Sequence, residues 1–296
     1  MSDSQKYDRQ KLIPGWDQDV LSNSKVAVVG AGALGNHVCL GLIGLGIGTI
    51  KIYDFDDIEP HNLNRQSLFC EEDIGKNKAE VLAYRLKERN SSLIILGINE
   101  KIEEETIDMV LRDVDVIVDC VDLIRVRRIL NRYCLWEDIP LVHGGISWRG
   151  GQTGIITRKT PCVNCIFPKA IQERELEVET SCINKPDPSV VYISQILAGL
   201  MVYNVRRVIL PLKTESALSQ LDRGAEKASS SEFALIKLDF NLINPFYMKT
   251  QKRKSDCECV EILKEVAPEI LEKERSEKES NDKEETKELK KLLNSE

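Results

Sequence analysis

The 296-residue sequence lacks the long apolar run of a membrane protein and the basic excess of a nucleic-acid-binding protein. Its longest apolar stretches have the length of a strand or are interrupted by glycine, whereas a membrane helix needs about 20 apolar residues. Residues 1–7 are polar and do not resemble a signal peptide. The formal net charge is −7, and nucleic-acid binding rests on clustered lysine and arginine. We therefore expect a cytoplasmic protein that contacts neither membranes nor nucleic acids.

Histidine is also scarce, and its placement argues against a histidine-based metal site. None of the three histidines has a second histidine or a cysteine at metal-ligand spacing, so we interpret all three as structural or solvated. Cysteine, in contrast, occurs nine times. Cytoplasmic proteins rarely form disulfide frameworks, so each cysteine has to be explained as a core residue, a metal ligand or a nucleophile. Cys120 and Cys134 lie in apolar surroundings, and we expect them in the core.

Residues 25–65 have the pattern of a strand, a glycine turn, a helix and a second strand. Residues 26–29 are apolar without polar alternation, as in a strand buried on both faces of a parallel sheet. The following GAGALG fits G-x-G-x-x-G, in which the first glycine turns the chain, the second admits a phosphate and the third packs helix against strand. These glycines are Gly30, Gly32 and Gly35, and Asp54 follows the second strand where a ribose hydroxyl is usually bound. The unit therefore predicts nucleotide binding.

Three polar residues beyond Asp54 favour ATP over a nicotinamide dinucleotide. Asn62 and Arg65 lie in the loop after the ribose-binding strand, where a dehydrogenase needs a cation only for a 2′-phosphate. Lys78 lies in the first turn of a helix predicted over 75–89, although a cation in the first turn opposes the helix dipole. A triphosphate nearby would remove this conflict, and preorganised cations stabilise the charge that develops when a triphosphate is cleaved. An NAD-dependent dehydrogenase is the disfavoured alternative.

A carboxylate follows the fourth predicted strand, which spans residues 114–120. Asp122 would lie at the carboxyl edge of the sheet, where open α/β sheets bind their ligands. Mg²⁺ prefers one or two carboxylates together with phosphate oxygens. Asp122 is therefore the candidate magnesium ligand.

In their order and spacing, these motifs resemble those of the ubiquitin-activating-enzyme superfamily, which includes the bacterial ThiF and MoeB proteins and the small homodimeric activating enzymes for ubiquitin-like proteins. The resemblance rests on GAGALG, on DFD followed by NLNRQ, on GKNKAE, and on DCVD with Arg127 and Asn131. It covers most of residues 1–260. Leu123 departs from the family pattern, which usually has asparagine there. The resemblance implies an α/β fold: a Rossmann-like nucleotide-binding domain with a mixed, mainly parallel sheet, a small antiparallel sheet and a structural zinc site.

The resemblance also implies a set of ATP ligands and a second subunit. The positions that match the nucleotide-binding residues of the family are Gly30, Gly32, Gly35, Asp54, Asn62, Arg65, Lys78 and Asp122. Arg65 and Lys78 would stabilise the phosphates, and Asp122 would hold Mg²⁺. Arg9 lies in a Y-x-R-Q element, and in homodimeric relatives this arginine reaches the ATP phosphates of the partner subunit. A homodimer in which Arg9 acts in trans is therefore expected.

Two cysteine pairs are candidates for a zinc site. Cys162 and Cys165 form C-x-x-C, and Cys257 and Cys259 form C-x-C in a polar setting. The thiolates of a C-x-x-C can reach the same metal ion, and four thiolates complete a structural zinc site. Relatives carry such a site built from two pairs, although the C-x-C spacing departs from theirs. A redox-active C-x-x-C is the alternative, but we expect no helix N-terminus at this pair.

Cys182 stands apart, in a polar, turn-rich loop expected over 170–190 and ahead of an apolar helix predicted over 190–210. An exposed thiol in front of a helix can have a lowered pKa and act as a nucleophile. In the family, a cysteine before this helix takes the C-terminus of a ubiquitin-like protein as a thioester or a related sulfur adduct. A surface cysteine in a flexible loop is the alternative.

We divide the chain into an adenylation domain over 1–266, which includes the 170–190 loop and the zinc site, and a charged, solvated or disordered tail over 267–296. The resemblance implies ATP-dependent activation of a ubiquitin-like modifier ending in Gly-Gly, by C-terminal adenylation and then thioester formation on Cys182. A downstream conjugating or sulfur-transfer protein would receive the product. Two alternatives stay open: adenylation of a sulfur-carrier protein without a cysteine step, as in ThiF and MoeB, and a non-catalytic partner subunit.

Overall fold

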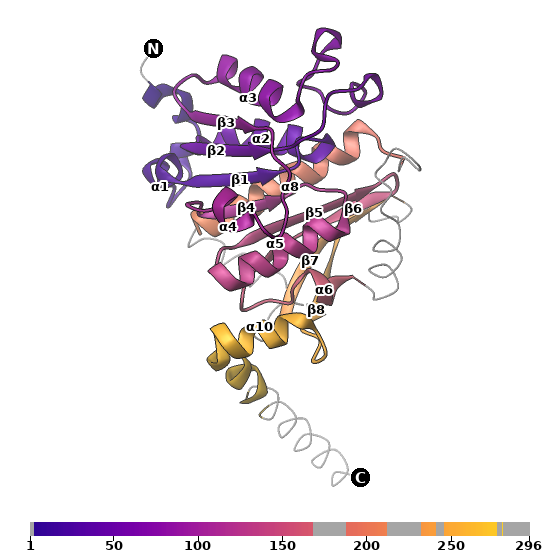
Figure 1. The fold of residues 1–296 in the computed structure, drawn as a ribbon. Coiled ribbons are helices and arrows are strands. Elements are labelled where there is room, and N and C mark those ends of the chain that lie inside the picture. Colours follow the sequence, from indigo (N-terminus) through magenta and orange to yellow (C-terminus); the bar gives the residue numbers. More distant parts are fainter. Residues whose placement is uncertain (1–2, 168–187, 212–231, 241–245, 277–279, 281–296) are drawn as a thin grey trace.

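The fold is built on one eight-stranded sheet (Figure 1). The computed structural model describes residues 3–167, 188–211, 232–240, 246–276 and 280. In spatial order the strands are β3 (Ile94–Ile98), β2 (Thr49–Tyr53), β1 (Lys25–Val29), β4 (Val116–Asp119), β5 (Leu141–Ser147), β6 (Gly150–Ile156), β7 (Glu232–Asp239) and β8 (Phe246–Lys252). The pairs from β3 to β5 are parallel and those from β5 to β8 are antiparallel. The predicted mixed, mainly parallel sheet is confirmed, and its antiparallel part continues the same sheet.

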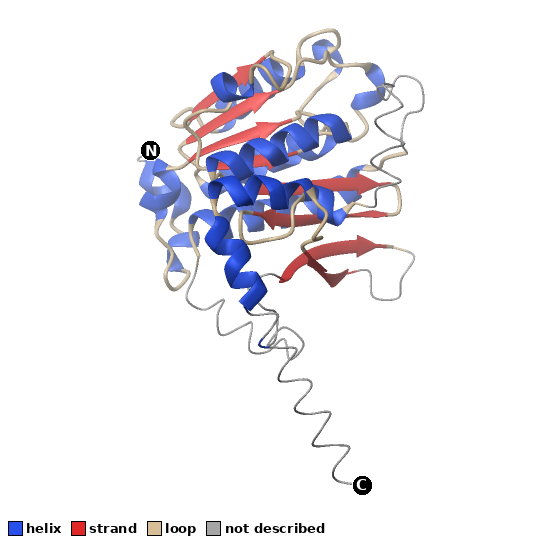
Figure 2. Cartoon of the chain, turned by 60° about the horizontal axis from the view of Figure 1, so that its bottom comes forward, coloured by secondary structure: helices blue, strands red, loops and turns tan. Residues whose placement is uncertain are grey.

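Alternate residues of β1, the middle one of the five parallel strands, point into two separate cores. Val26 and Val28 pack into the core that contains α2 (Ala33–Leu45), α3 (Lys78–Arg89) and α8 (Val191–Ile209). Ala27 and Val29 pack into the core that contains α4 (Ile107–Val110), α5 (Ile124–Glu137) and α10 (Glu258–Val266). A strand that is apolar at every position can bury both faces in this way. The helices therefore cover both sides of the sheet (Figure 2).

Short elements complete the described part of the chain. They are η1 (Asp3–Tyr7), η2 (Gln10–Leu12), α1 (Gln18–Asn23), η3 (Pro60–Asn62), η4 (Glu71–Asp73) and α6 (Val163–Ile166). Asp17 caps α1 by accepting hydrogen bonds from the amides of Asp19 and Val20. Between residues 268 and 276 the chain is helical, and Glu274 forms an ion pair of 3.1 Å with Arg253. No helix among the described residues is long and apolar enough to cross a membrane.

The sixth strand was placed wrongly by the sequence pattern. We expected residues 148–152 to connect two strands and the strand to begin at Gly154, whereas β6 begins at Gly150. The glycines of GGQTG have no β propensity, so this part of the strand was hidden. A Cβ atom at Gly150 would lie 1.8 Å from the carbonyl oxygen of Leu238 on β7, so glycine is required for the close approach of the two strands.

Candidate nucleotide and metal sites

The glycine turn connects β1 to α2 at the carboxyl edge of the parallel strands. Gly30 has φ +97°, a conformation that favours glycine, and its amide donates to the carbonyl of Tyr53 over 2.8 Å. A Cβ atom at Gly35 would lie 1.8 Å from the carbonyl oxygen of Gly30, so the third glycine allows the helix to pack against the turn. At Gly32, in contrast, a Cβ would have one neighbour within 4 Å among the described residues beyond the adjacent ones in the chain, namely Nε2 of Gln66 at 3.9 Å. Gly32 therefore borders open space, as a phosphate-binding turn requires.

Asp54 is attached directly to this turn. Its Oδ2 accepts a hydrogen bond of 2.6 Å from the amide of Ala31, and its Oδ1 accepts one of 2.9 Å from the amide of Asp56. Burial raises the pKa of Asp54, whereas Lys78 and the two amides act in the opposite direction. The carboxylate is thus held at the end of β2, beside the phosphate-binding turn, where a ribose hydroxyl would reach it.

Lys78 lies in the first turn of α3 and is buried, with a relative exposure of 9%. Its Nζ lies 2.9 Å from Oδ2 of Asp56, whose side chain is 53% exposed. Asn77 caps the helix by accepting from the amide of Glu80, and its Nδ2 donates to the carbonyl of Asp54. The anion that we expected near Lys78 is therefore present in the protein itself. The ion pair leaves Lys78 next to Asp54 and so next to the glycine turn.

Arg65 lies in a loop that two side chains of α2 hold in place. Nε2 of His37 lies 3.2 Å from the carbonyl oxygen of Arg65, and Oδ1 of Asn36 accepts a hydrogen bond of 2.9 Å from the amide of Leu68. Burial lowers the pKa of His37, so the neutral imidazole donates from Nε2 to this carbonyl. The loop that carries Arg65 is thereby fixed to the helix that follows the glycine turn.

Within this loop, the side chains of Asn62 and Arg65 already have partners. Oδ1 of the buried Asn62 accepts from the amide of Glu59 over 3.0 Å. The guanidinium of Arg65 donates to the carbonyl of His61 and to Oδ1 of Asn64. The Asn62 side chain therefore stabilises the turn, and the Arg65 guanidinium is held by contacts within the same loop.

Gln66, which lies beside Gly32, has an unsatisfied polar atom. Its side chain is buried, and its Oε1 has no hydrogen-bond partner among the described residues. Nδ2 of Asn36, on the helix after the turn, is also buried and unsatisfied in the described part of the chain. Buried polar atoms without partners are costly and rare. The Gln66 side chain lies next to the space at Gly32, so its unsatisfied oxygen fits a site whose bound nucleotide is polar.

Asp122 is exposed in the loop after β4. The parallel register pairs Val29 with Asp119, so this loop and the glycine turn leave neighbouring strands at the same edge. A Cβ atom at Gly30 would lie 2.7 Å from the carbonyl oxygen of Cys120, which shows how closely the two loops approach. The structure thus brings Asp122 to the same edge as the predicted phosphate-binding turn.

A buried ionic network of Asp119, Arg127 and His143 contacts the backbone just before Asp122. Oδ2 of Asp119 lies 2.8 Å from Nε of Arg127 and 2.8 Å from Nδ1 of His143, and Oδ1 accepts from the amide of Val121. Burial acts to raise the pKa of Asp119, but Arg127, His143 and the Val121 amide outweigh it and lower the pKa. Burial lowers the pKa of His143, which is consistent with its predicted structural role.

Arg9 lies far from the glycine turn of its own chain. Its neighbour Gln10 donates to the carbonyl of Leu45, the last residue of α2, whereas the glycine turn precedes the first residue of the same helix. The 13 residues of α2 span about 20 Å. Arg9 is exposed, but a side chain of its length does not bridge that distance. Within one chain, the structure therefore does not bring Arg9 to the other predicted nucleotide ligands.

The four predicted zinc ligands form one buried cluster. The sulfur of Cys162 lies 3.9 Å from that of Cys165 and 3.5 Å from that of Cys257, and the sulfurs of Cys165 and Cys259 are 3.7 Å apart. A tetrahedral zinc ion with Zn–S bonds of about 2.3 Å separates its sulfurs by about 3.8 Å. The cluster therefore has the dimensions of a Cys₄ zinc site, and the C-x-C spacing does not prevent it.

Donors around the cluster match the negative charge of thiolates. The amide of Lys254 donates to the sulfur of Cys165 over 3.3 Å, and the guanidinium of Arg253 lies 3.6 Å from the sulfur of Cys259. Our expectation that no helix begins at the C-x-x-C was wrong, because Cys162 is the N-cap of α6. That helix is one turn long, and Cys162 and Cys165 face a second cysteine pair, which is typical of a metal site rather than of a redox pair.

Cys182 and the 170–187 part of the predicted loop lie outside the described residues. The described part of the predicted helix after it, α8, begins at Val191. Cys120 and Cys134 are buried in the core, as the sequence predicted.

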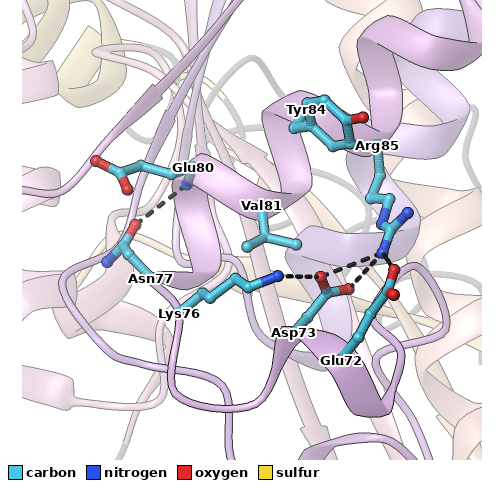
Figure 3. A pocket seen from close by; sticks show the side chains of 8 residues that line it. All are labelled: Glu72, Asp73, Lys76, Asn77, Glu80, Val81, Tyr84 and Arg85. Atoms are coloured by element: carbon cyan, nitrogen blue, oxygen red, sulfur yellow. Dashed lines mark hydrogen bonds and ion pairs between the residues drawn. The ribbon is translucent and has the colours of Figure 1, made fainter.

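A separate depression lies on the outer side of α3 (Figure 3). Its volume is about 650 Å³, and it is lined by Glu72, Asp73, Lys76, Asn77, Glu80, Val81, Tyr84 and Arg85. Arg85 forms ion pairs with Glu72 and Asp73, over 2.7 and 3.0 Å, and Lys76 lies 3.4 Å from Asp73. These charges satisfy one another. None of the predicted nucleotide ligands lines this depression, so we assign it no function.

Sequence reasoning missed the side chains that hold the predicted ligands in place. Asn36 and His37 left a signal, because they are the only polar residues within the apolar sequence ALGNHVCLGLIGL of α2. The roles of Asp119 and His143 left none, because their contacts join residues that are far apart in the sequence.

The fold and these sites define an α/β protein with a glycine turn at the carboxyl edge of its parallel strands and a Cys₄ cluster. The model of the ThiF family matches residues 7–259, so the chain belongs to the ThiF family.

Two curated relatives and one solved protein show which members it resembles. The SAMP-activating enzyme E1 of Haloferax volcanii is 36% identical over 153 residues, which cover 52% of this chain and 57% of that protein. The chain thus spans a little over half the length of this relative. The sulfur carrier protein ThiS adenylyltransferase of Escherichia coli is 30% identical over 203 residues, or 67% of this chain and 80% of that protein. Escherichia coli MccB, solved with AMPCPP and selenomethionine MccA, is 26% identical with a TM-score of 0.67 over 87% of this chain and 75% of that chain.

Proposed function

We propose that this protein uses ATP to adenylate the C-terminal carboxylate of a ubiquitin-like or sulfur-carrier protein. The observation that carries the proposal is the open side of Gly32, bordered by the Asp54 carboxylate, the buried Lys78 and the loop of Asp122. The relatives support it, because one is a SAMP-activating enzyme, another is a ThiS adenylyltransferase, and MccB has also been solved with ATP.

In the proposed reaction, a carboxylate oxygen of the carrier attacks the α-phosphorus of ATP, and pyrophosphate leaves. The attacking carboxylate is already ionised at neutral pH, so no side chain has to act as a strong base. Gly32 and the amides of the turn would bind the phosphates, and Asp54 would bind the ribose. Arg65 and Lys78 would stabilise the charge on the phosphates, and Asp122 would hold Mg²⁺. Positioning and electrostatic stabilisation then provide the catalysis.

For Lys78 to reach a phosphate, its ion pair with Asp56 has to be shared or exchanged. The Asp56 side chain is about half exposed, so its carboxylate can rotate into solvent and stay hydrated when a phosphate takes its place beside Lys78. The nucleotide phosphates would then replace Asp56 as the partner of the buried ammonium.

The Cys₄ cluster fits zinc, which we propose as its ligand. Four sulfurs at tetrahedral spacing, with donors from Arg253 and Lys254 beside them, leave no open position for a substrate. The role of the metal would therefore be structural, holding α6 and the start of α10 together.

A second step on Cys182 is our finer proposal. The Cys182 thiolate would attack the carbonyl carbon of the acyl-adenylate, form a thioester with the carrier and release AMP. The relatives are equally compatible with a sulfur-carrier pathway that has no cysteine thioester. Thioester formation would make the protein a ubiquitin-like-modifier activating enzyme with a downstream conjugating partner, and its absence would point to sulfur transfer.

We also propose a homodimer in which Arg9 of each subunit completes the nucleotide site of the other. The support is the distance of about one α2 length between the Arg9 segment and the glycine turn of the same chain. The proposed adenylation domain spans residues 1–266, with 267–296 as an additional charged segment.

The test is ATP–pyrophosphate exchange by the pure protein with candidate carriers that end in Gly-Gly. We expect exchange that requires the carrier, falls at least about 100-fold in Asp122→Ala and persists in Cys182→Ala. A carrier adduct that a thiol reagent can release, present in the wild type and absent in Cys182→Ala, would support the thioester step. ATP binding without exchange for any carrier would contradict catalysis and support a non-catalytic subunit.

A further inference from the structure

Helix α5 touches both sites through two side chains that lie one turn apart. Arg127 donates to the carbonyl oxygens of Val121 and Gly144, the latter over 3.1 Å. Asn131, four residues later, accepts a hydrogen bond of 2.9 Å from the amide of Val163 at the start of α6. One helix face therefore contacts the strand end that leads to Asp122 and the helix that carries the C-x-x-C.

Phe167 makes a second connection between the same two regions. It directly follows α6, and its ring centroid lies 5.6 Å from the guanidinium carbon of Arg127 and 5.6 Å from the ring of His143, at 84°. Its carbonyl accepts a hydrogen bond of 3.2 Å from Nζ of Lys254, whose own amide donates to the sulfur of Cys165. The backbone of Phe167 is thus fixed by the cysteine cluster, and its ring packs on the Asp119 network.

The Asp119 network connects the Phe167 ring to the proposed nucleotide site through Val121. Asp119 accepts from the Val121 amide, and Arg127 donates to the Val121 carbonyl, so both polar groups of this peptide segment are held. Asp122 is the next residue. If the Phe167 ring moves, the guanidinium loses a packing partner within the buried network, and the backbone before Asp122 loses its support.

We propose that Phe167 is a positioning residue that couples metal binding at the Cys₄ cluster to nucleotide binding at the Asp122 loop. The inference rests on the proposed binding of Mg·ATP and goes beyond it, because it makes the metal site a determinant of nucleotide affinity. Coupling between two binding equilibria is reciprocal, so bound Mg·ATP must also hold the metal more tightly.

The experiment measures how much Zn²⁺ a zinc-selective chelator withdraws from the 296-residue chain at equilibrium, which gives the zinc affinity. It is done with and without saturating Mg·ATP, in the absence of any carrier protein, so that no adenylation occurs. We expect Mg·ATP to reduce zinc loss in the wild type by an amount equivalent to an about fivefold or larger gain in zinc affinity. In Phe167→Leu, which keeps an apolar side chain but removes the ring, the nucleotide should no longer reduce zinc loss. Phe167→Tyr, which keeps the ring, should retain the effect.

Phe240→Leu is the matched control. Phe240 packs edge-on against Tyr192, with centroids 5.5 Å apart, and has no ring contact with the Asp119 network. Its substitution should leave the coupling unchanged. Equal zinc affinities with and without bound Mg·ATP in the wild type would overturn the inference without any variant. Retained coupling in a zinc-loaded Phe167→Leu would overturn the role of Phe167.

The two proposals fail in different ways. If the wild type does not bind Mg·ATP, the proposed function is contradicted, and a direct binding measurement by calorimetry shows this. If Mg·ATP binds and zinc loss is unaffected, the proposed function stands and only the coupling is refuted.

Discussion

Replacing Gly32, Gly35 or Gly44 by alanine, one at a time, should separate effects on stability from effects on ATP affinity. All three glycines lie in the turn after β1 or in the helix α2 that follows it. At Gly35, an alanine Cβ would lie 1.8 Å from the carbonyl oxygen of Gly30 and 2.8 Å from its carbonyl carbon. Both are backbone atoms of the turn, so they cannot move aside as a flexible side chain can. The helix must shift away from β1, and its start carries Asn36 and His37, which hold the Arg65 loop.

The magnitudes follow from these contacts. Overpacking in a rigid region costs about 1–3 kcal/mol, and this overlap is with backbone, so we expect about 3 kcal/mol for Gly35→Ala. For a protein of this size, such a loss lowers the thermal midpoint by about 6–12 °C. At Gly44, on the same helix, an added Cβ would have no neighbour within 4 Å in the described part of the chain, apart from the helix's own backbone. Gly44→Ala should therefore stabilise the protein by up to about 1 kcal/mol, through helix propensity.

Gly32→Ala gives the third outcome. The added methyl group would meet only Nε2 of Gln66 at 3.9 Å, so the thermal midpoint should change little. The methyl group would fill the space proposed for a phosphate, and ATP affinity should fall at least about 10-fold. Differential scanning fluorimetry and calorimetric titration with Mg·ATP measure the two effects. A Gly35→Ala protein as stable as Gly44→Ala, or a Gly32→Ala protein with unchanged ATP affinity, would refute the reasoning.

Three further predictions concern a pKa, a cation and the dimer. Burial lowers the pKa of His37, so the folded protein resists protonation of this side chain. The stability of the protein should therefore fall as the pH drops below about 6.5. In a pH series, the thermal midpoint of His37→Gln should fall less steeply than that of the wild type. Lys78→Met should weaken Mg·ATP binding about 10–100-fold by calorimetry, because a charged hydrogen bond contributes about 1.5–3 kcal/mol; an unchanged affinity would remove Lys78 from the site. Arg9→Ala and Asp122→Ala should each be inactive alone. An equal mixture of the two variants should recover up to about a quarter of the wild-type ATP–pyrophosphate exchange, because half of the dimers would have one intact site. No recovery after confirmed subunit exchange would argue against action of Arg9 in trans.

The glycine turn and Asp54 could be predicted because each requirement is local. The apolar strand, the three glycine positions and the acidic residue are all readable within 30 residues. The hydrogen bond from the Ala31 amide to Asp54, which attaches the carboxylate to the turn, could not be predicted in this way. The cysteine cluster was also predictable, although its two pairs are 92 residues apart between Cys165 and Cys257. Two cysteine pairs at metal-ligand spacing have few other uses where no disulfide framework is expected, so the residue types alone indicated that the pairs meet.

The remaining features depend on contacts that the sequence does not display. The Asp119 network joins β4, α5 and β5, and Arg127 could be named only as a family match, without its partners. The start of β6 was missed because glycine is selected there by the approach of β7 rather than by strand propensity. The helix at the C-x-x-C was missed because its first amide, that of Val163, is satisfied by Asn131, a residue 32 positions earlier.

The central claim is that a carboxylate oxygen of a carrier protein attacks the α-phosphorus of ATP. The most direct measurement uses a carrier labelled with oxygen-18 in its C-terminal carboxylate, incubated with the protein, Mg·ATP and hydroxylamine. Hydroxylamine attacks the carbonyl carbon of the acyl-adenylate, so AMP leaves with one oxygen that came from the carrier. The account predicts AMP that contains oxygen-18, also with Cys182→Ala and not with Asp122→Ala. Unlabelled AMP, with all of the heavy oxygen retained in the carrier, would contradict it.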